Sequence, residues 1–460
     1  MGGTKSEQVD RARDSLLLPL RPDPPGTSRQ RGSISEARDW LIRMQLRVAD
    51  RIRVNVLAPG VPLDMPLERT PEAEKKALEA ISTLTKSGKL RFPERVSKKL
   101  VVFNILNEVF GLGPLEPLLD PEEVTEIMVN GPYIVYIERG GKLVESGHKF
   151  LDDDHLERII KRIIKPLGRE VSYDHPLVDA RLMDGSRVNA VIRPCAIDGP
   201  SITIRKFAKH RFTIEDLIRF DSLTKKMAYF LRALVLARMN VVVSGGTGSG
   251  KTTLVNALSA FIPEGERIVT IEDAAELSMK QRHVVRLETK RASVESPSEV
   301  TIRDLIKNSL RMRPERIIIG ECRSGEALDM LQAMNTGHDG SITTVHANNP
   351  RDCISRLETL VLMSGVDLPV LVVRRQIASA VHWIVQASRL RDGSRKITHI
   401  TEVQRMEGDV VILNPVFEFE DDGDDSDGKI RGRHIATGNR PGDISAFRKH
   451  GISFKSDFFT

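Results

Sequence analysis

Apolar residues near the start of the chain recur at helical spacing. Ser33 begins the first such segment, with a glutamate three positions later as in a capping box, and apolar residues follow at 37, 40, 41, 44, 48 and 52. A second helix is predicted to begin at Thr70, because Pro71 suits the first helical position after an N-cap. A third segment of the same period covers about 97–110. Together they predict a small helical module over 33–110.

Short runs rich in β-branched residues replace this pattern further along the chain. Turn pairs such as Asn130-Gly131 bound several of these runs, and a helical pattern lies between them at 156–167. The pattern predicts an α+β domain over 111–207, and we expect residues 208–213 to form a hinge linker. The runs themselves cover 127–129, 134–137, 188–192 and 202–204.

Helical and strand patterns alternate from about residue 224 onward. The runs 268–271 and 317–319 are continuously apolar, as expected of strands in a parallel sheet that is buried on both faces. This alternation predicts an α/β fold for residues 214–416. Seven carboxylates then occupy the ten positions 418–427, and such a run predicts a solvated acidic loop over 417–428.

The bulk composition is that of an ordinary globular protein with two or three domains. The chain has 460 residues, of which 40% are hydrophobic and 29% are charged. Its net charge is +6, because 69 basic residues are largely balanced by 63 acidic ones. This balance favours a solvated surface over a nucleic-acid groove, and it is also compatible with an anionic membrane face. We therefore expect no nucleic-acid partner.

Cysteine content, hydropathy and the first residues bear on where the chain resides. The three cysteines are odd in number and far apart, which argues against a disulfide framework and predicts a reducing, cytosolic compartment. No run approaches 18 uninterrupted apolar residues, and so no membrane-spanning helix is expected. Residues 1–32 are rich in Pro, Arg, Ser and Gly without apolar periodicity, and we expect them to be disordered.

A glycine-rich phosphate-binding loop follows the apolar run 241–243. It fits the pattern G-x-x-x-x-G-K-[ST], with a strand before it and a helix after it. Its glycines let backbone N–H groups approach phosphate oxygens, Lys251 would place a positive charge on the β- and γ-phosphates, and the Thr252 hydroxyl would bind Mg²⁺. ATP and Mg²⁺ are the expected cofactors. The predicted nucleotide-binding residues are Gly245, Gly246, Thr247, Gly248, Ser249, Gly250, Lys251, Thr252 and Thr253.

Two acidic segments are candidates for the chemistry beside this loop. Glu272-Asp273 follows one predicted strand and Glu321 follows another, so both would lie at the carboxyl ends of strands, where doubly wound sheets bind their ligands. One carboxylate could orient the attacking water while another holds Mg²⁺ through its waters. The simpler alternative is that Asp273 caps a helix and Glu321 forms a salt bridge. The neighbouring phosphate-binding loop favours the functional interpretation.

Two histidines, His338 and His346, lie eight positions apart in a glycine- and threonine-rich segment. Neither their spacing nor any nearby cysteine suggests a zinc site. The spacing alone leaves two interpretations open, a packing role and a role as sensor of the γ-phosphate.

Four segments in this order resemble the motifs of a known family. The loop 245–253, the segment 270–277, the pair 311–314 and 320–323, and the segment 337–348 look like the Walker A, Asp-box, Walker B and His-box motifs of the secretion ATPases. These are the hexameric motors of type II and type IV secretion, type IV pili and archaella. The resemblance implies a RecA-like P-loop ATPase domain, preceded by the α+β domain and the helical module.

Further segments are similar to the CpaF branch of this family, which drives assembly of tight-adherence (Flp) pili. They are 113–119, 124–131, 179–189, 204–207 and 432–459. The last of them implies a folded C-terminal helical tail over 429–460. The branch implies a homohexamer that acts on inner-membrane platform proteins from the cytoplasmic side, peripheral to the inner membrane.

The resemblance assigns roles to the acidic segments. Glu272 would be the general base that activates water, and Glu321 would be the Walker B acid. Thr252, Glu321 and Asp273 would serve the Mg²⁺ ion, and Arg323 would contribute to the nucleotide site.

It also assigns roles to basic residues. Arg181, Arg187 and Arg205 would reach the phosphates of the same or a neighbouring subunit as arginine fingers, because a guanidinium fork matches phosphate oxygens. Lys251, His338 and His346 would complete the catalytic set.

Two functions from other classes compete with a motor. A DNA or RNA translocase would need a basic channel and usually aromatic stacking residues, but aromatic residues make up only 5% of the chain. A nucleotide-gated scaffold would bind ATP and barely hydrolyse it, and the presence of both Glu272 and Glu321 argues against it. Within the family, type IV secretion or type II motors are the nearest alternatives.

Overall fold

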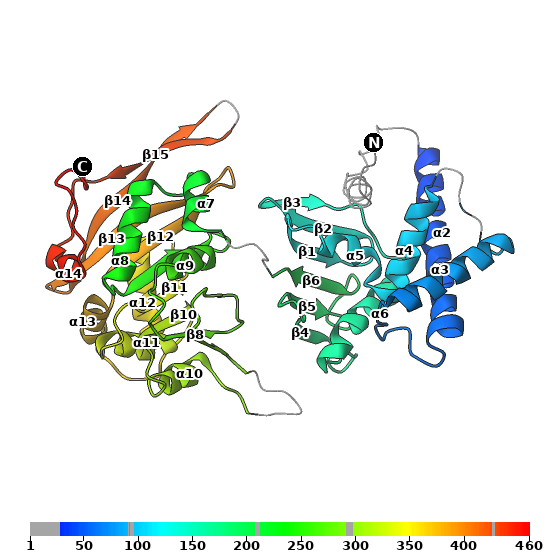
Figure 1. The fold of residues 1–460 in the computed structure, drawn as a ribbon, viewed down its shortest axis with the longest axis horizontal. Coiled ribbons are helices and arrows are strands. Elements are labelled where there is room, and N and C mark those ends of the chain that lie inside the picture. The colour runs from blue at the N-terminus through cyan, green and yellow to red at the C-terminus, as the bar shows by residue number, and fades with distance from the viewer. Residues whose placement is uncertain (1–27, 91, 93–95, 208–211, 291–297, 426–427) are drawn as a thin grey trace. The chain divides into compact units, whose positions relative to one another are not determined.

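The computed structural model describes residues 28–90, 92, 96–207, 212–290, 298–425 and 428–460. Contacts within the chain divide it into two compact units, Met1–Lys209 and His210–Thr460 (Figure 1). Most of the predicted hinge linker 208–213, and most of the predicted disordered segment 1–32, lie outside the described residues. In the part of the chain that is described, every helix is too short or too polar to cross a bilayer.

The first unit begins with the predicted helical module. Thr70 caps its second helix as predicted, because the side chain accepts a hydrogen bond from the Ala73 N–H. The first helix begins at Ser28 rather than at Ser33, and the expected disorder of 28–32 is therefore wrong. That segment contains no proline, so nothing in it ends the helix at the predicted cap. The elements are α2 (Ser28–Ile52), a π-helical turn (Arg53–Leu57), α3 (Pro71–Lys86) and α4 (Lys98–Phe110).

A buried arginine joins this module to the α+β domain. Arg162 of α6 (Asp153–Ile164) donates hydrogen bonds to the carbonyl oxygens of Glu108, Gly111 and Leu63 at 2.9, 2.7 and 2.8 Å. The first two acceptors belong to the C-terminal end of α4, whose last carbonyls have no partner within the helix. Arg162 is 2% exposed, and burial lowers its pKa to about 10, which leaves it charged at neutral pH. The helical module and the α+β domain are therefore joined by buried hydrogen bonds from Arg162.

The α+β domain is a six-stranded antiparallel sheet with helices packed on one face. Its strands lie in the order β3-β2-β1-β6-β5-β4. The buried side chains of α6 pack against those of the sheet in one apolar core, which includes Ile127, Ile159 and Ile204. The strands are β1 (Val124–Asn130), β2 (Ile134–Arg139), β3 (Lys142–Glu145), β4 (Leu177–Arg181), β5 (Arg187–Val191) and β6 (Ser201–Arg205), and short helical segments cover Gly113–Leu115, Glu116–Leu119 (α5) and Lys165–Leu167.

A nine-stranded sheet forms the centre of the second unit, and its order is β15-β14-β13-β12-β7-β11-β10-β8-β9. The six strands from β12 to β9 run parallel, as the continuous apolar runs predict, and the other three are antiparallel. The parallel strands are β7 (Val241–Gly245), β8 (Ile268–Glu272), β9 (Val284–Glu288), β10 (Arg316–Cys322), β11 (Ile342–Val345) and β12 (Trp383–Arg389). The antiparallel ones are β13 (Arg395–Glu407), β14 (Val410–Asp424) and β15 (Ile430–Ala436).

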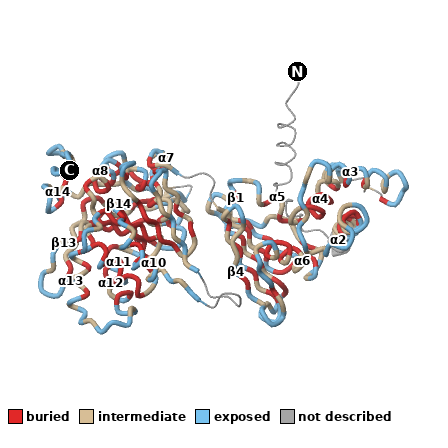
Figure 2. Tube along the Cα trace, turned by 60° about the horizontal axis from the view of Figure 1, so that its bottom comes forward, coloured by how far each residue is buried: buried red, intermediate tan, exposed pale blue. Residues whose placement is uncertain are grey.

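Both faces of this sheet are covered by helices. Val241 and Val243 pack in one apolar core with α8 and α9, whereas Val242 packs in the other with α11, α12 and α13. This alternation explains why the central strands are buried throughout (Figure 2). The fold is thus the predicted α/β class. The helices are α7 (Ile214–Arg219), α8 (Lys225–Leu236), α9 (Lys251–Ser259), α10 (Ile302–Ser309), α11 (Glu326–Asn335), α12 (Pro350–Leu362), α13 (Val370–Ala380) and α14 (Ile444–Lys449).

The acidic run is a strand over most of its length, and the predicted loop over 417–428 is wrong. Five of its carboxylates lie on β14, and arginines elsewhere in the chain pair with three of them: Arg433 of β15 pairs with Glu420, and Arg391, in the turn between β12 and β13, pairs with Asp421 and Asp424. The composition of one segment cannot reveal charges that a neighbouring strand supplies. The predicted helical tail is only partly helical. It begins with strand β15 and contains one short helix, α14.

The last residues of the chain pack into an aromatic cluster on α8, and we expect Phe459→Ala to lower the free energy of unfolding by about 3 kcal/mol. Phe459 is 1% exposed, and its ring centroid lies 5.0–5.8 Å from those of Phe230, Phe454 and Phe458. Denaturant unfolding of the full chain measures the effect. Phe220→Ala is the control, because that ring is 47% exposed, and a loss as large there would contradict the prediction.

Candidate functional site

The predicted phosphate-binding loop connects β7 to α9 at the carboxyl edge of the parallel sheet. Gly245 ends β7, and a Cβ atom on it would lie 2.2 Å from the Ala387 carbonyl oxygen of β12. Gly250 immediately precedes α9 and has a φ of +95°, a conformation that favours glycine. The loop therefore places the positive end of a helix dipole, and its backbone N–H groups, where an anion can bind.

Lys251 directs its ammonium group into this loop. Its Nζ donates hydrogen bonds to the carbonyl oxygens of Gly245 and Gly246 at 3.0 and 2.9 Å, and it lies 3.3 Å from His346 Nε2. The residue is 9% exposed, so its charge acts in a partly desolvated environment. The position suits the predicted contact with phosphate oxygens.

The Glu272 side chain is buried, and one of its two carboxylate oxygens has no hydrogen-bond partner among the described residues. It ends β8, is 3% exposed, and its Oε1 accepts hydrogen bonds from the N–H groups of Glu276 and Leu277, both at 2.8 Å. Its Oε2 is buried without a hydrogen-bond partner among the described residues. Burial raises the pKa of Glu272 to about 7, although the two backbone hydrogen bonds act in the opposite direction. A carboxylate of this pKa is suited to accept a proton at neutral pH.

Glu321, near the end of β10, connects the remaining polar residues. Its Oε1 lies 2.8 Å from His346 Nε2, and its Oε2 lies 2.6 Å from Arg323 Nη2. Arg323 also lies 3.6 Å from Asp273, whose Oδ1 accepts a hydrogen bond from the Thr289 hydroxyl. Burial and the Lys251 ammonium lower the pKa of His346, which keeps the imidazole neutral at neutral pH in spite of Glu321. Strands β7, β8, β10 and β11 thus bring six of the predicted residues to one edge: Lys251, Glu272, Asp273, Glu321, Arg323 and His346.

The protein ligands available for Mg²⁺ are few, as expected for a nucleotide-bound ion. No group of three or more His, Cys, Asp or Glu side chains in the described ranges could hold a metal alone. Mg²⁺ at nucleotide sites keeps several waters and takes one or two protein ligands besides phosphate oxygens. Thr252, in the first turn of α9, and Glu321 fit such a donor set. Asp273 is a comparable donor, because Thr289 and Arg323 engage it while His346 and Arg323 engage Glu321.

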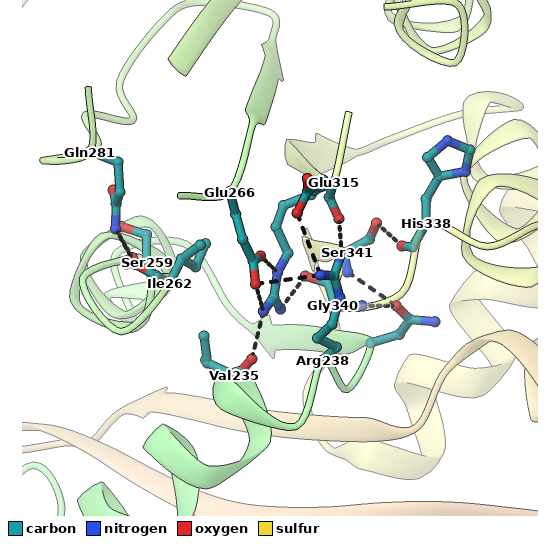
Figure 3. A network of polar contacts seen from close by, with 12 residues as sticks. Val235, Arg238, Ser259, Ile262, Glu266, Gln281, Glu315, His338, Gly340 and Ser341 are labelled. Carbon is teal, nitrogen blue, oxygen red and sulfur yellow. Dashed lines mark hydrogen bonds and ion pairs between the residues drawn. The ribbon is translucent and has the colours of Figure 1, made fainter. Parts of the chain in front are cut away.

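The structure does not bring His338 to this edge of the sheet. His346 follows β11 at its carboxyl end, whereas His338 precedes the strand, so the four residues of β11 separate them by roughly 13 Å. In Figure 3 the His338 ring points away from the polar network around Gly340 and Ser341. The spacing of eight residues could not reveal the intervening strand, and a catalytic role for His338 stays a prediction.

The three predicted arginine fingers lie in a single cross-strand row. Arg181 of β4 pairs in register with Arg187 of β5, which pairs with Arg205 of β6. Arg205 in turn opposes Glu126 of β1, and its Nε lies 3.5 Å from that carboxylate. Partners in register share a face of the sheet, so the three guanidinium groups form one basic strip. The strip belongs to the first unit, whereas the phosphate-binding loop belongs to the second.

Two arginines near the loop were not predicted. Arg395 Nε donates a hydrogen bond to the Gly248 carbonyl oxygen at 2.9 Å, and Arg389 Nη1 lies 3.6 Å from where a Cβ of Gly248 would be. Both residues flank the turn between β12 and β13. The pair Asp392-Gly393 is a hairpin signal that could have located this turn in the sequence, but not its position beside the loop.

Known proteins are similar to this chain over the region that contains the site. The family model described as "Type II/IV secretion system protein" matches residues 108–413. "Putative conjugal transfer protein Rv3659c" of Mycobacterium tuberculosis (strain ATCC 25618 / H37Rv) is 37% identical over 309 residues, which cover 66% of this chain and 87% of that protein. "Type IV secretion system protein VirB11" of Brucella suis biovar 1 is 34% identical over 323 residues, covering 64% and 89%.

Solved structures of related proteins also match. The VirB11 ATPase from the Brucella suis type IV secretion system is 33% identical, with 63% of this chain and 96% of that chain covered and a TM-score of 0.35. The Legionella pneumophila ATPase DotB is 20% identical, with 66% and 81% covered and a TM-score of 0.47. The family match extends over more than half of the chain and includes the whole phosphate-binding loop and its acidic partners. The chain therefore belongs to the Type II/IV secretion system protein family.

Proposed function

We propose that this protein is a Mg·ATP-hydrolysing motor of a secretion or pilus system. The observation that carries the proposal is the pairing of the phosphate-binding loop with Glu272, a buried carboxylate whose pKa of about 7 lets it take a proton from water. A protein that only bound nucleotide would not require this residue. The family membership supports the same conclusion.

Each residue of the site has a role in this proposal. Backbone N–H groups of the loop and the Lys251 ammonium hold the phosphates, and Glu272 orients and deprotonates the attacking water. Thr252 and Glu321 would hold Mg²⁺, which when bound neutralises charge on the phosphates. His346 is kept neutral between Lys251 and Glu321, so it can respond when a γ-phosphate changes the charge beside Lys251.

The motor itself would be a ring of identical subunits. We propose a homohexamer in which Arg181, Arg187 and Arg205 contact the nucleotide of the same or a neighbouring subunit. One row of three guanidinium groups supports a shared anionic ligand. Hydrolysis would then change the arrangement of the two units, and inner-membrane platform proteins would receive this movement on the cytoplasmic side.

Two systems are candidates for what the motor drives. The segments similar to the CpaF branch favour assembly of tight-adherence (Flp) pili. The names of the relatives, "conjugal transfer protein" and "Type IV secretion system protein", favour a conjugation or type IV secretion motor instead. Pull-down of membrane partners from the native cell distinguishes the two.

Steady-state ATP hydrolysis and particle mass, measured on the same sample, test the proposal. We expect Mg²⁺-dependent turnover and particles of ring size. A monomer without turnover at any protein concentration would contradict the motor and favour a scaffold. Nucleic-acid binding with a steep salt dependence would favour a translocase, because such a slope counts displaced counterions.

A further inference from the structure

The β12–β13 hairpin runs along the phosphate-binding loop. Strand β12 pairs in parallel with β7 as far as the pair Ala387–Gly245, and then continues to Arg389. Strand β13 begins with Arg395, which is the cross-strand partner of Arg389. The side chains of Arg389 and Arg395 therefore lie at the edge of the sheet where the phosphate-binding loop begins.

Arg395 contacts the loop backbone at one defined peptide. Its Nε donates to the Gly248 carbonyl oxygen at 2.9 Å, and its Cδ lies 3.7 Å from where a Cβ of Gly250 would be. In a trans peptide the C=O and the following N–H point in opposite directions. A Gly248 carbonyl held toward Arg395 therefore turns the Ser249 N–H toward the loop interior. The Ser249 N–H donates a long hydrogen bond, 3.4 Å between N and O, to the Gly246 carbonyl oxygen, which also accepts from Lys251.

The hairpin is fixed on its other side by the acidic strand. Arg391 pairs with Asp424 at 2.7 Å and with Asp421 at 3.1 Å. Asp392 accepts hydrogen bonds from Ser394 and from the Ile430 N–H, and these contacts lower its pKa to about 2. Among the residues described, Arg391 is thus engaged in ion pairs, whereas no ion pair is found for Arg395.

Arg389 is the cross-strand partner of Arg395, and both side chains lie against glycines of the loop. Two positive charges therefore lie beside the place where a nucleotide phosphate would bind.

We propose that Arg395 is a positioning residue of the nucleotide site. It holds the Gly248–Ser249 peptide in the orientation that directs the Ser249 N–H at the phosphate chain of a nucleoside di- or triphosphate, and Arg389 adds a second positive charge beside it. The inference rests on the proposed function, because it assumes that the loop binds ATP and ADP.

The test compares Arg395→Ala with Arg391→Ala, which removes the same charge from the same hairpin away from the loop. We expect Arg395→Ala to weaken binding of Mg·ADP about tenfold and to raise KM for ATP by a similar factor, with kcat nearly unchanged, because the loop holds ground state and transition state alike. Arg391→Ala should bind Mg·ADP like the wild type. Arg395→Lys should restore part of the affinity, since an ammonium can donate one hydrogen bond but lacks the fork.

Several outcomes would overturn the inference. Equal Mg·ADP affinities for Arg395→Ala and Arg391→Ala would do so, as would a loss of kcat with an unchanged KM. Thermal unfolding without nucleotide shows whether a variant has a folding defect. If Arg395→Ala unfolds at a lower temperature than the wild type, the Mg·ADP affinities of Arg395→Gln and Arg395→Lys are compared with that of Arg391→Ala instead. Failure of the wild type itself to bind Mg·ADP would contradict the proposed function instead.

Discussion

Glu272→Gln is expected to stop ATP turnover almost completely while leaving ATP binding intact. Removal of a general base typically costs about 10²–10⁴-fold in rate. The Gln carbonyl oxygen can still accept the two hydrogen bonds that Oε1 receives from Glu276 and Leu277, so the local structure beside the loop should be kept. Steady-state turnover and Mg·ATP binding measured together separate chemistry from binding. If the variant kept full turnover, Glu321 would become the better candidate for the base.

The pH dependence of the wild type should report the same group. Glu272 accepts a proton only in its ionised form, so kcat should rise with pH through about 7, the value to which burial raises its pKa. Burial and the Lys251 ammonium lower the pKa of His346, so its titration should lie below this rise in kcat. The residual kcat of Glu272→Gln should not show this rise with pH. A wild-type profile that is flat between pH 6 and 8 would exclude Glu272 as the base.

The same substitution should stabilise the folded protein at pH 8. The pKa of Glu272 is about 7 in the folded protein against a model value of 4.5, so between these values the unfolded chain ionises while the folded site keeps its proton. Stability therefore falls as pH rises through this window, by an amount on the order of 3 kcal/mol. Glutamine avoids this cost but buries an unpaired amide, which costs about 1–2 kcal/mol at either pH. We therefore expect a net gain of about 1–2 kcal/mol at pH 8 that becomes a net loss of about the same size near pH 4.5. Thermal unfolding at the two pH values measures it.

Glu266→Ala should be the most damaging substitution for folding of the second unit. Arg316 begins β10, is fully buried, and its guanidinium contacts both Glu266 oxygens and the carbonyl oxygens of Val235 and Gly340. Removing the carboxylate leaves an uncompensated buried charge, which typically costs about 3–5 kcal/mol. Denaturant unfolding of the full chain is the measurement.

A matched control for this prediction lies in the same network. Glu315 pairs with Arg238 at 3.6 Å but is 46% exposed, so Glu315→Ala should cost less than about 1 kcal/mol. In an Arg316→Met background, Glu266→Ala should cost much less than in the wild type, because no buried charge is then left unpaired. Equal losses for Glu266→Ala and Glu315→Ala would show that Arg316 does not depend on Glu266.

The sequence predicted those features that depend on short-range pattern. Thr70 begins a helix, the apolar runs form buried parallel strands, and the phosphate-binding loop lies between a strand and a helix. The adjacency of Glu272 and Glu321 was also predictable, because both follow strands of one parallel sheet. The family resemblance was confirmed, whereas the CpaF branch stays a prediction.

Features that depend on pairing between distant segments could not be predicted. Most of the acidic run forms part of strand β14, where arginines of β15 and of the β12–β13 turn balance its charge. His338 and His346 are separated by a strand that their spacing does not disclose. The row formed by Arg181, Arg187 and Arg205 follows from strand register, and the contact of Arg395 with Gly248 spans 147 positions of the chain.

The hydrogen bonds from Arg162 to the end of α4 limit where this chain can be divided, in evolution or in engineering. The family match begins at residue 108, yet Arg162 also bonds the Leu63 carbonyl oxygen, and Arg53 bonds the Val109 carbonyl from the other side of that boundary. A chain cut at 108 would keep the buried arginine and lose one of its acceptors. The helical module therefore cannot be exchanged independently of the α+β domain. A module taken from another family member would need a hydrogen-bond acceptor for Arg162, or Arg162 would have to be substituted as well.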